Sequence, residues 1–65
     1  MKEFVKINDT RIRKNTIKRY IPMDRNKITV YYSPGRNKVD FESFPFPTLE
    51  DRDKMVEELD LNFLI

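Results

Sequence analysis

Apolar and polar residues alternate with a period of two over the first two thirds of this 65-residue chain. Such alternation is typical of strands that bury one face. It predicts strands at residues 3–7 and 10–14, joined by a tight turn at residues 8–9, because Asn and Asp tolerate left-handed backbone conformations. The first part of the chain is therefore expected to be a β-hairpin.

A third strand is predicted over residues 16–21, with Ile17, Arg19 and Ile21 on one face. Pro22 should end this strand, because proline has no N–H to donate to a neighbouring strand.

The clearest strand covers residues 27–33, where nearly every side chain is β-branched or aromatic. A turn at residues 33–35 should follow, with Gly35, the only glycine, supplying a positive φ. The chain then returns as a hairpin partner over residues 38–44. A central hairpin is thus expected between residues 27 and 44.

The last third of the chain has helical spacing. Residues 45–48 form a proline-rich connector, and Thr48 has the position of a helix N-cap, with Asp51 at the third helical position. The apolar spacing predicts an amphipathic helix over residues 49–60 with one apolar and one acidic face. Residues 61–65 are an apolar tail that could continue the helix, pack across the sheet, or add as a strand to a neighbouring molecule.

Together these elements predict one α+β domain over residues 1–65. Its expected architecture is a small antiparallel sheet or an SH3-like partly closed barrel, with four to five short strands over residues 1–44 and one C-terminal α-helix. A chain this short buries only about 60% of its unfolded surface, so the core must be well packed. The expected core residues are Phe4, Ile7, Ile12, Ile17, Ile28, Val30, Val39, Phe41, Leu49, Val56 and Leu59.

The composition argues against an enzyme. The chain has no cysteine and no histidine, which removes disulfides, thiolate or imidazole metal ligands, and a histidine base for Ser33 or Ser43. One glycine cannot make a glycine-rich phosphate loop. The helical carboxylates are better explained as a solvated face than as an acid–base pair or a Mg²⁺ or Ca²⁺ site. We therefore expect no catalysis, no cofactor, no metal and no small-molecule substrate.

The N-terminus is charged within three residues, and no apolar stretch long enough for a signal peptide follows. No run approaches the roughly 20 apolar residues of a membrane span. A cytoplasmic protein without a membrane partner is expected.

Charge divides the chain into two parts. Residues 1–38 carry eleven Lys and Arg against three Asp and Glu, whereas residues 39–65 carry two against eight. Basic groups interleaved with aromatic rings on a sheet can contact nucleic-acid backbones or an acidic partner. Equally, cations protect strand edges from aggregation. The candidate binding residues are Arg11, Arg13, Lys14, Lys18, Arg19, Tyr20, Lys27 and Tyr31.

The apolar tail suggests a second type of contact. Its side chains are candidates for contact with a partner or with a second subunit, namely Leu61, Phe63, Leu64 and Ile65. The leading hypothesis is therefore a non-enzymatic interaction module that binds a protein partner or forms a homodimer, in which the basic sheet of one subunit meets the acidic helix of the other. Nucleic-acid binding through the basic sheet is the alternative.

The order of these elements also resembles a known family. A basic first hairpin, an Ile17-Lys18-Arg19 segment, the strand at residues 27–32, a turn and a closing amphipathic helix are similar to the small archaeal chromatin proteins of the seven-kilodalton class. This resemblance implies an SH3-like barrel with a C-terminal helix, and binding to duplex DNA in the minor groove. The chain lacks their glycine-rich loops and carries fewer lysines, so no DNA-contacting position is carried over. In style it is also similar to short uncharacterised proteins of bacteriophages and mobile elements, which often act by binding a host protein.

Overall fold

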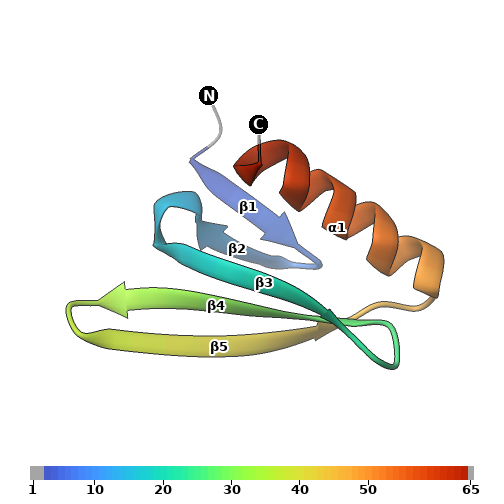
Figure 1. Cartoon of the computed structure of the whole chain (residues 1–65), viewed down its shortest axis with the longest axis horizontal. Helices are drawn as coiled ribbons and strands as arrows, with labels where there is room; N and C mark the ends of the chain where they lie inside the picture. The colour runs from blue at the N-terminus through green and yellow to red at the C-terminus, as the bar shows by residue number, and fades with distance from the viewer. Residues whose placement is uncertain (1–2, 65) are drawn as a thin grey trace.

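Five short antiparallel strands and one C-terminal helix make up the computed structural model, which describes residues 3–64 (Figure 1). The elements in chain order are β1 (Phe4–Ile7), β2 (Thr10–Arg13), the 3₁₀ helix η1 (Lys14–Thr16), β3 (Ile17–Met23), β4 (Lys27–Gly35), β5 (Lys38–Pro45) and α1 (Leu49–Phe63). The predicted α+β class is confirmed, and so is the order of strands followed by a C-terminal helix.

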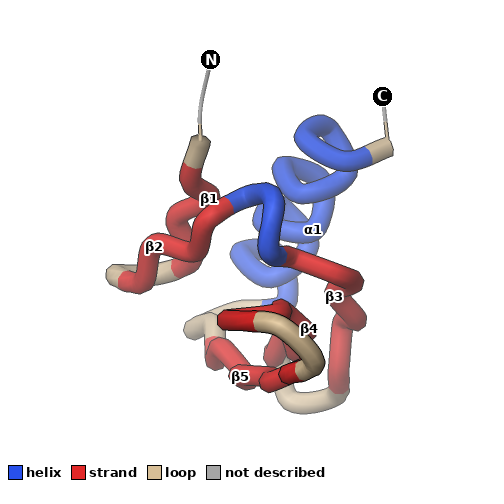
Figure 2. Tube along the Cα trace, turned by 90° about the vertical axis from the view of Figure 1, so that its left-hand side faces the viewer, coloured by secondary structure: helices blue, strands red, loops and turns tan. Residues whose placement is uncertain are grey.

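The strands form two separate antiparallel sheets, a β1–β2 hairpin and a three-stranded sheet of order β3–β4–β5. Within residues 3–64 these sheets do not join into a closed barrel. In Figure 2 the hairpin, the helix and the three-stranded sheet lie on three sides of the molecule, facing a common interior. The described strands thus form two small antiparallel sheets rather than a closed barrel.

All three units contribute side chains to one core. Its buried residues are Val5, Ile7, Ile12, Ile28, Val30, Phe44, Met55 and Leu59. Four of these, Ile7, Ile28, Val30 and Leu59, are fully buried. Burial of each such side chain is worth about 1.5–3 kcal/mol, so these contacts hold the hairpin and the helix against the sheet.

Five of the predicted core residues are confirmed, because their side chains are buried: Ile7, Ile12, Ile28, Val30 and Leu59. Ile17 and Val56 are partly buried against this core. Four predicted core residues are wrong, because much of each side chain is exposed: Phe4 (45%), Leu49 (53%), Phe41 (61%) and Val39 (69%).

Strand register explains the exposed residues of β5. Ile28 and Val30 of β4 point into the core, and the pairing places Phe44 beside Ile28 and Glu42 beside Val30. Because side chains alternate along a strand, Val39 and Phe41 must point the opposite way. Phe44 therefore occupies the core in their place.

Strand register and helix spacing also explain the exposed residues of β1 and α1. Val5 pairs with Ile12 and is buried with it, which turns Phe4 to the outside. On α1, Met55 and Leu59 are four residues apart and share the buried stripe. Leu49 is six residues before Met55, on another side of the helix.

A bulge in β3 changes the predicted face assignment. Ile17 pairs with Tyr32 but Arg19 pairs with Tyr31, so Lys18 is an extra residue in the ladder. Beyond the bulge, Tyr20 lies beside Val30 on the inner side. Arg19 consequently lies on the outer side rather than on the same face as Ile17.

The expected stop at Pro22 is wrong, because β3 continues through Pro22 to Met23. β3 is an edge strand, and proline is tolerated where its missing N–H would face away from the sheet.

The expected turn at residues 33–35 is also wrong. β4 continues to Gly35, which pairs with Lys38, so the turn consists of residues 36–37. The left-handed residue of this turn is Asn37, with φ 59°, and Gly35 does not have a positive φ. Ser33 and Pro34 instead form a bulge, facing one residue of β5.

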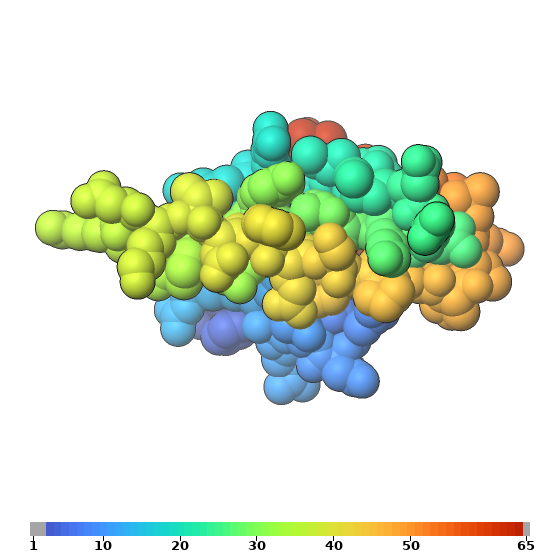
Figure 3. All heavy atoms as spheres, turned by 90° about the horizontal axis from the view of Figure 1, so that it is seen from below, coloured from blue at the N-terminus to red at the C-terminus, as the bar shows by residue number. Residues whose placement is uncertain are grey.

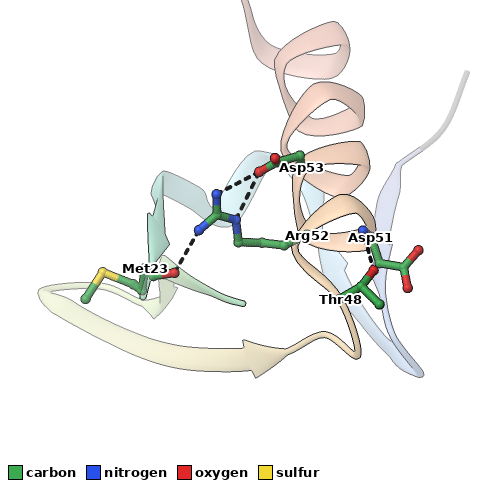
Figure 4. A network of polar contacts seen from close by, with 5 residues as sticks. All are labelled: Met23, Thr48, Asp51, Arg52 and Asp53. Atoms are coloured by element: carbon green, nitrogen blue, oxygen red, sulfur yellow. Dashed lines mark hydrogen bonds and ion pairs between the residues drawn. The ribbon is translucent and has the colours of Figure 1, made fainter. Parts of the chain in front are cut away.

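The helix begins as the sequence predicts. The Thr48 side chain accepts a hydrogen bond of 3.1 Å from the Asp51 N–H (Figure 4). This satisfies one of the free donors at the helix start. α1 then continues to Phe63, three residues beyond the expected end at residue 60. Within residues 3–64 no helix has the length and apolar character to cross a membrane.

An arginine connects the start of the helix to the end of β3. The Arg52 guanidinium donates to the Met23 carbonyl at 2.9 Å and to the Asp53 carboxylate at 2.7 Å (Figure 4). Because Arg presents several donors in one plane, it can satisfy both acceptors at once. This contact positions α1 relative to the three-stranded sheet.

Candidate functional site

The side of the β3–β4–β5 sheet that points away from the hairpin and the helix is here named the outer sheet face. Seen from below, atoms of the three strands lie side by side across it (Figure 3). Register and alternation assign to it Arg19, Ile21, Met23, Lys27, Thr29, Tyr31, Val39, Phe41 and Ser43. This face carries most of the exposed apolar residues of the strands.

A row of stacked side chains crosses all three strands of this face. The Arg19 guanidinium lies 4.6 Å from the centroid of the Tyr31 ring. The Tyr31 and Phe41 rings lie 5.7 Å apart and are tilted by 37°. Cation–π and aromatic contacts of this kind hold the three side chains in a defined orientation.

The charge of the outer sheet face has one sign. Among the described residues assigned to it, Arg19 and Lys27 carry charge, and both are cations. Asp40 and Glu42 belong to the opposite side of β5, because they alternate with Phe41. The face therefore combines apolar and aromatic groups with positive charge.

β5 has a neighbouring strand on one side only. On its free side the Phe41 N–H donates to the Asp40 carboxylate at 2.9 Å. A charged side chain at an unpaired strand edge opposes the addition of further strands. Asp40 therefore occupies one of the backbone donors that an incoming strand would need.

A second exposed surface, here named the hairpin outward face, consists of Phe4, Lys6, Arg11 and Arg13. Lys6 pairs with Arg11, and Phe4 pairs with Arg13. The Arg13 guanidinium lies 5.5 Å from the centroid of the Phe4 ring. All four point away from the core, because Val5, Ile7 and Ile12 occupy the other side.

A third group lies around the C-terminal end of α1. The Tyr20 hydroxyl donates to the Asp60 carboxylate at 2.7 Å, and the Tyr20 ring lies 5.9 Å from that of Phe63. The Lys14 Nζ lies 5.6 Å from the centroid of the same Phe63 ring. An open hollow of about 370 Å³ lies here, lined by Ile17, Lys18, Arg19, Tyr20, Phe63 and Leu64.

Burial raises the pKa of Tyr20 to about 12, with further contributions from the hydrogen bond to Asp60 and from the negative charge of that carboxylate. All three causes disfavour the phenolate. Tyr20 thus remains a hydrogen-bond donor to the helix over the neutral pH range.

The predicted basic surface divides among these three places. Arg11 and Arg13 lie on the hairpin outward face, and Arg19, Lys27 and Tyr31 on the outer sheet face. Lys14, Lys18 and Tyr20 lie near the C-terminal end of α1.

The sequence prediction missed several residues of these surfaces, namely Phe4, Lys6, Met23, Val39 and Phe41. For the hairpin a signal was present, because a two-residue turn at residues 8–9 already places Lys6 opposite Arg11.

The predicted tail residues do not form one surface. Leu61 and Leu64 are exposed, whereas Phe63 is partly buried against the core and Tyr20. Ile65 lies outside the described residues. Contact of this tail with a partner stays a prediction.

Both serine hydroxyls are engaged in structural hydrogen bonds. Ser33 Oγ lies 2.7 Å from the Lys38 carbonyl oxygen and 2.9 Å from that of Gly35. Ser43 Oγ lies 2.9 Å from the Thr29 hydroxyl. Within residues 3–64 no three His, Cys, Asp or Glu side chains are grouped to share a metal ion.

The fold defines a small α+β domain of antiparallel strands closed by one C-terminal helix. No protein-family model, curated protein or solved structure matches the chain.

Proposed function

We propose that this chain is a non-enzymatic protein-binding module and that the outer sheet face is its binding surface. The observation that carries the proposal is the exposure of Val39 and Phe41 on β5, with Met23 of β3 exposed at the other end of the same face. Exposed apolar groups gathered on one face of a small domain are typical of protein interaction sites. Phe, Tyr, Met and Arg are also the residue types enriched where interfaces are fully buried.

The aromatic row supports a role as the centre of this surface. Tyr31 and Phe41 contact each other, and Arg19 lies on the Tyr31 ring. Side chains that are already ordered lose little conformational freedom on binding. Aromatic and Arg side chains of this kind commonly carry most of the energy of an interface.

The charge of the surface indicates the chemistry of the partner. Arg19 and Lys27 are cations and no carboxylate shares their face among the described residues. A complementary partner presents apolar side chains bordered by Asp or Glu. Two copies of this chain docked through the same face would bring like charges together, and a heterologous contact of this face with the acidic helix of a second copy would leave an open sheet and an open helix for further copies. A different protein is therefore the better partner.

The engaged serine hydroxyls and the lack of histidine support a non-enzymatic role. An origin in a bacteriophage or mobile element stays a prediction, as does a cytoplasmic location.

The proposal is tested by selecting peptides from a random display library on the native chain. We expect enriched sequences to combine apolar residues with Asp or Glu, and Phe41→Ser to weaken their binding by roughly 30-fold, the effect of removing a central interface residue. Leu49→Ser is the matched control, because Leu49 lies outside the proposed surfaces and is 53% exposed, close to the 61% of Phe41.

Binding measured by titration should be unchanged in the Leu49→Ser variant. A selection that enriches no peptide, or peptides that bind native chain and Phe41→Ser equally, would contradict the proposal. Sedimentation of the chain alone tests the homodimer alternative, which requires a mass that rises with concentration.

A further inference from the structure

The hairpin outward face concentrates positive charge beside an exposed ring. Lys6 and Arg11 are directly opposite each other, and Arg13 stacks on Phe4, which is 45% exposed. The two carboxylates of this segment, Glu3 and Asp9, lie outside β1 and β2. The two strands therefore present three cations and one aromatic ring on one side.

This charge is not neutralised within the described part of the chain. The ion pairs found in residues 3–64 join Arg52 to Asp53 and Lys54 to Glu50, all on α1. Lys6, Arg11 and Arg13 form none of them. Their side chains are exposed and retain their donors for an external anion.

The spacing of these cations suits a chain of anions. Side chains on one face of a strand recur about every 6.8 Å, and cross-strand neighbours are about 5 Å apart. Flexible Lys and Arg side chains on such a grid can contact successive phosphates of a polynucleotide, and phosphate neutralisation supplies most of non-specific affinity.

The ring selects the type of polynucleotide. Arg13 lies over one side of the Phe4 ring, which is still 45% exposed, and unpaired bases stack on exposed aromatic rings. In a duplex the faces of the bases are covered by their neighbours. We infer that the hairpin outward face binds single-stranded nucleic acid, with Lys6, Arg11 and Arg13 on phosphates and Phe4 against a base.

This inference does not rest on the proposed function, because the hairpin outward face and the outer sheet face share no residue. Each surface is therefore testable by variants that leave the other unchanged.

The test is fluorescence anisotropy with a labelled single-stranded oligonucleotide and its duplex, between roughly 50 and 200 mM salt. Three phosphate contacts predict a slope of log affinity against log salt of about −2 for the single strand. Lys6→Gln combined with Arg11→Gln should reduce this slope to about −0.7. Arg36→Gln with Lys38→Gln is the matched control, since it removes the same charge from the β4–β5 turn.

A third variant tests stacking separately from charge. Phe4→Leu keeps an apolar side chain and the net charge, so we expect about tenfold weaker binding of the single strand with the salt slope unchanged. Urea denaturation of each variant distinguishes lost binding from lost folding.

Three outcomes would overturn the inference. The first is that the Lys6/Arg11 double variant and the Arg36/Lys38 double variant lose the same affinity for the single strand. The second is that the native chain binds duplex and single strand with equal affinity. The third is that Phe4→Leu binds the single strand as tightly as the native chain does. Salt-sensitive dimerisation that disappears with Lys6→Gln and Arg11→Gln, without oligonucleotide binding, would assign the cations to the acidic helix of a second copy instead.

Discussion

The inner and outer faces of the three-stranded sheet consist of alternate residues of the same strands, and both are rich in apolar groups. On the inner face Ile28, Val30 and Phe44 are buried. On the outer face Phe41 is exposed and Tyr31 half-buried. Composition alone does not distinguish these two faces. What distinguishes them is that the hairpin and the helix cover one face, whereas among the residues assigned to the other face Thr29 alone is buried.

Glu42 shows that the alternation of side chains along a strand does not alone decide burial. A residue on the inner side is buried only where the hairpin or the helix packs over it. Glu42 lies beside buried Val30, on the inner side of β5, and is nevertheless exposed. Phe44, two residues further along the same side, is buried. The inner face of β5 is thus part of the core only near its C-terminal end, where the chain turns towards α1.

The largest expected effect tests this comparison directly. Ile28→Ala should lower the free energy of unfolding by about 2–5 kcal/mol, because it leaves a cavity in the core. Phe41→Ala should lower it by less than about 1 kcal/mol, because its ring is mostly exposed. Urea denaturation measures both values.

Should Ile28→Ala prevent folding altogether, Ile28→Val provides a milder variant, with an expected loss of about 0.5–1.5 kcal/mol. Equal losses at residues 28 and 41 would show that the outer face is covered in solution.

An intermediate effect is expected at Tyr20, where the inner sheet face meets the helix. Tyr20→Phe removes the hydrogen bond to Asp60 and should cost about 1–2 kcal/mol at neutral pH. Because folding raises the pKa of Tyr20 to about 12, its contribution is complete below pH 10, the ordinary pKa, and is lost as pH rises through 12.

Denaturation of native chain and Tyr20→Phe between neutral pH and pH 12 measures this difference in stability, which should shrink at the alkaline end. Tyr31→Phe is the control on the outer sheet face. A difference that stays constant with pH would show that folding does not raise the pKa of Tyr20.

The smallest expected effect concerns the end of β4, where the bulge separates the regular sheet from the turn. Gly35 has no positive φ, and a Cβ built there meets no atom within 4 Å. Gly35→Ala should therefore stabilise the fold by about 0.4–1 kcal/mol, because alanine lowers the conformational entropy of the unfolded chain.

Asn37→Ala in the adjoining turn should have the opposite effect. Asn37 has φ 59°, a conformation that alanine adopts less readily, so the substitution should destabilise the fold by about 1 kcal/mol. Thermal unfolding of both variants measures these changes, and a destabilised Gly35→Ala would contradict the assigned backbone.

The sequence predicts the elements well because alternation, turn residues and the Thr48 cap are local signals. It does not predict which face of β5 is buried, because both faces carry apolar residues in strand alternation. Val39 and Phe41 lie on one face and Phe44 lies on the other. The bulges at Lys18 and at residues 33–34 add a further difficulty, since one extra residue exchanges the two faces without any change in composition.

The candidate surfaces were predictable to a different extent. The short turn at residues 8–9 sets the register of β1 and β2, so the common face of the hairpin cations can be derived from the sequence. The row of Arg19, Tyr31 and Phe41 depends on the β3 bulge and on pairing across three strands, and no local pattern contains it.

The topology also has a consequence for the order in which the molecule assembles. Within each sheet, strands that follow one another in sequence pair across connections of two or three residues. Hairpins of this kind close in about 1–10 μs. The Tyr20–Asp60 contact, by contrast, joins residues 40 positions apart. Both sheets can consequently pair through local contacts, whereas the common core requires the hairpin and α1 to dock on the three-stranded sheet through contacts between distant parts of the chain.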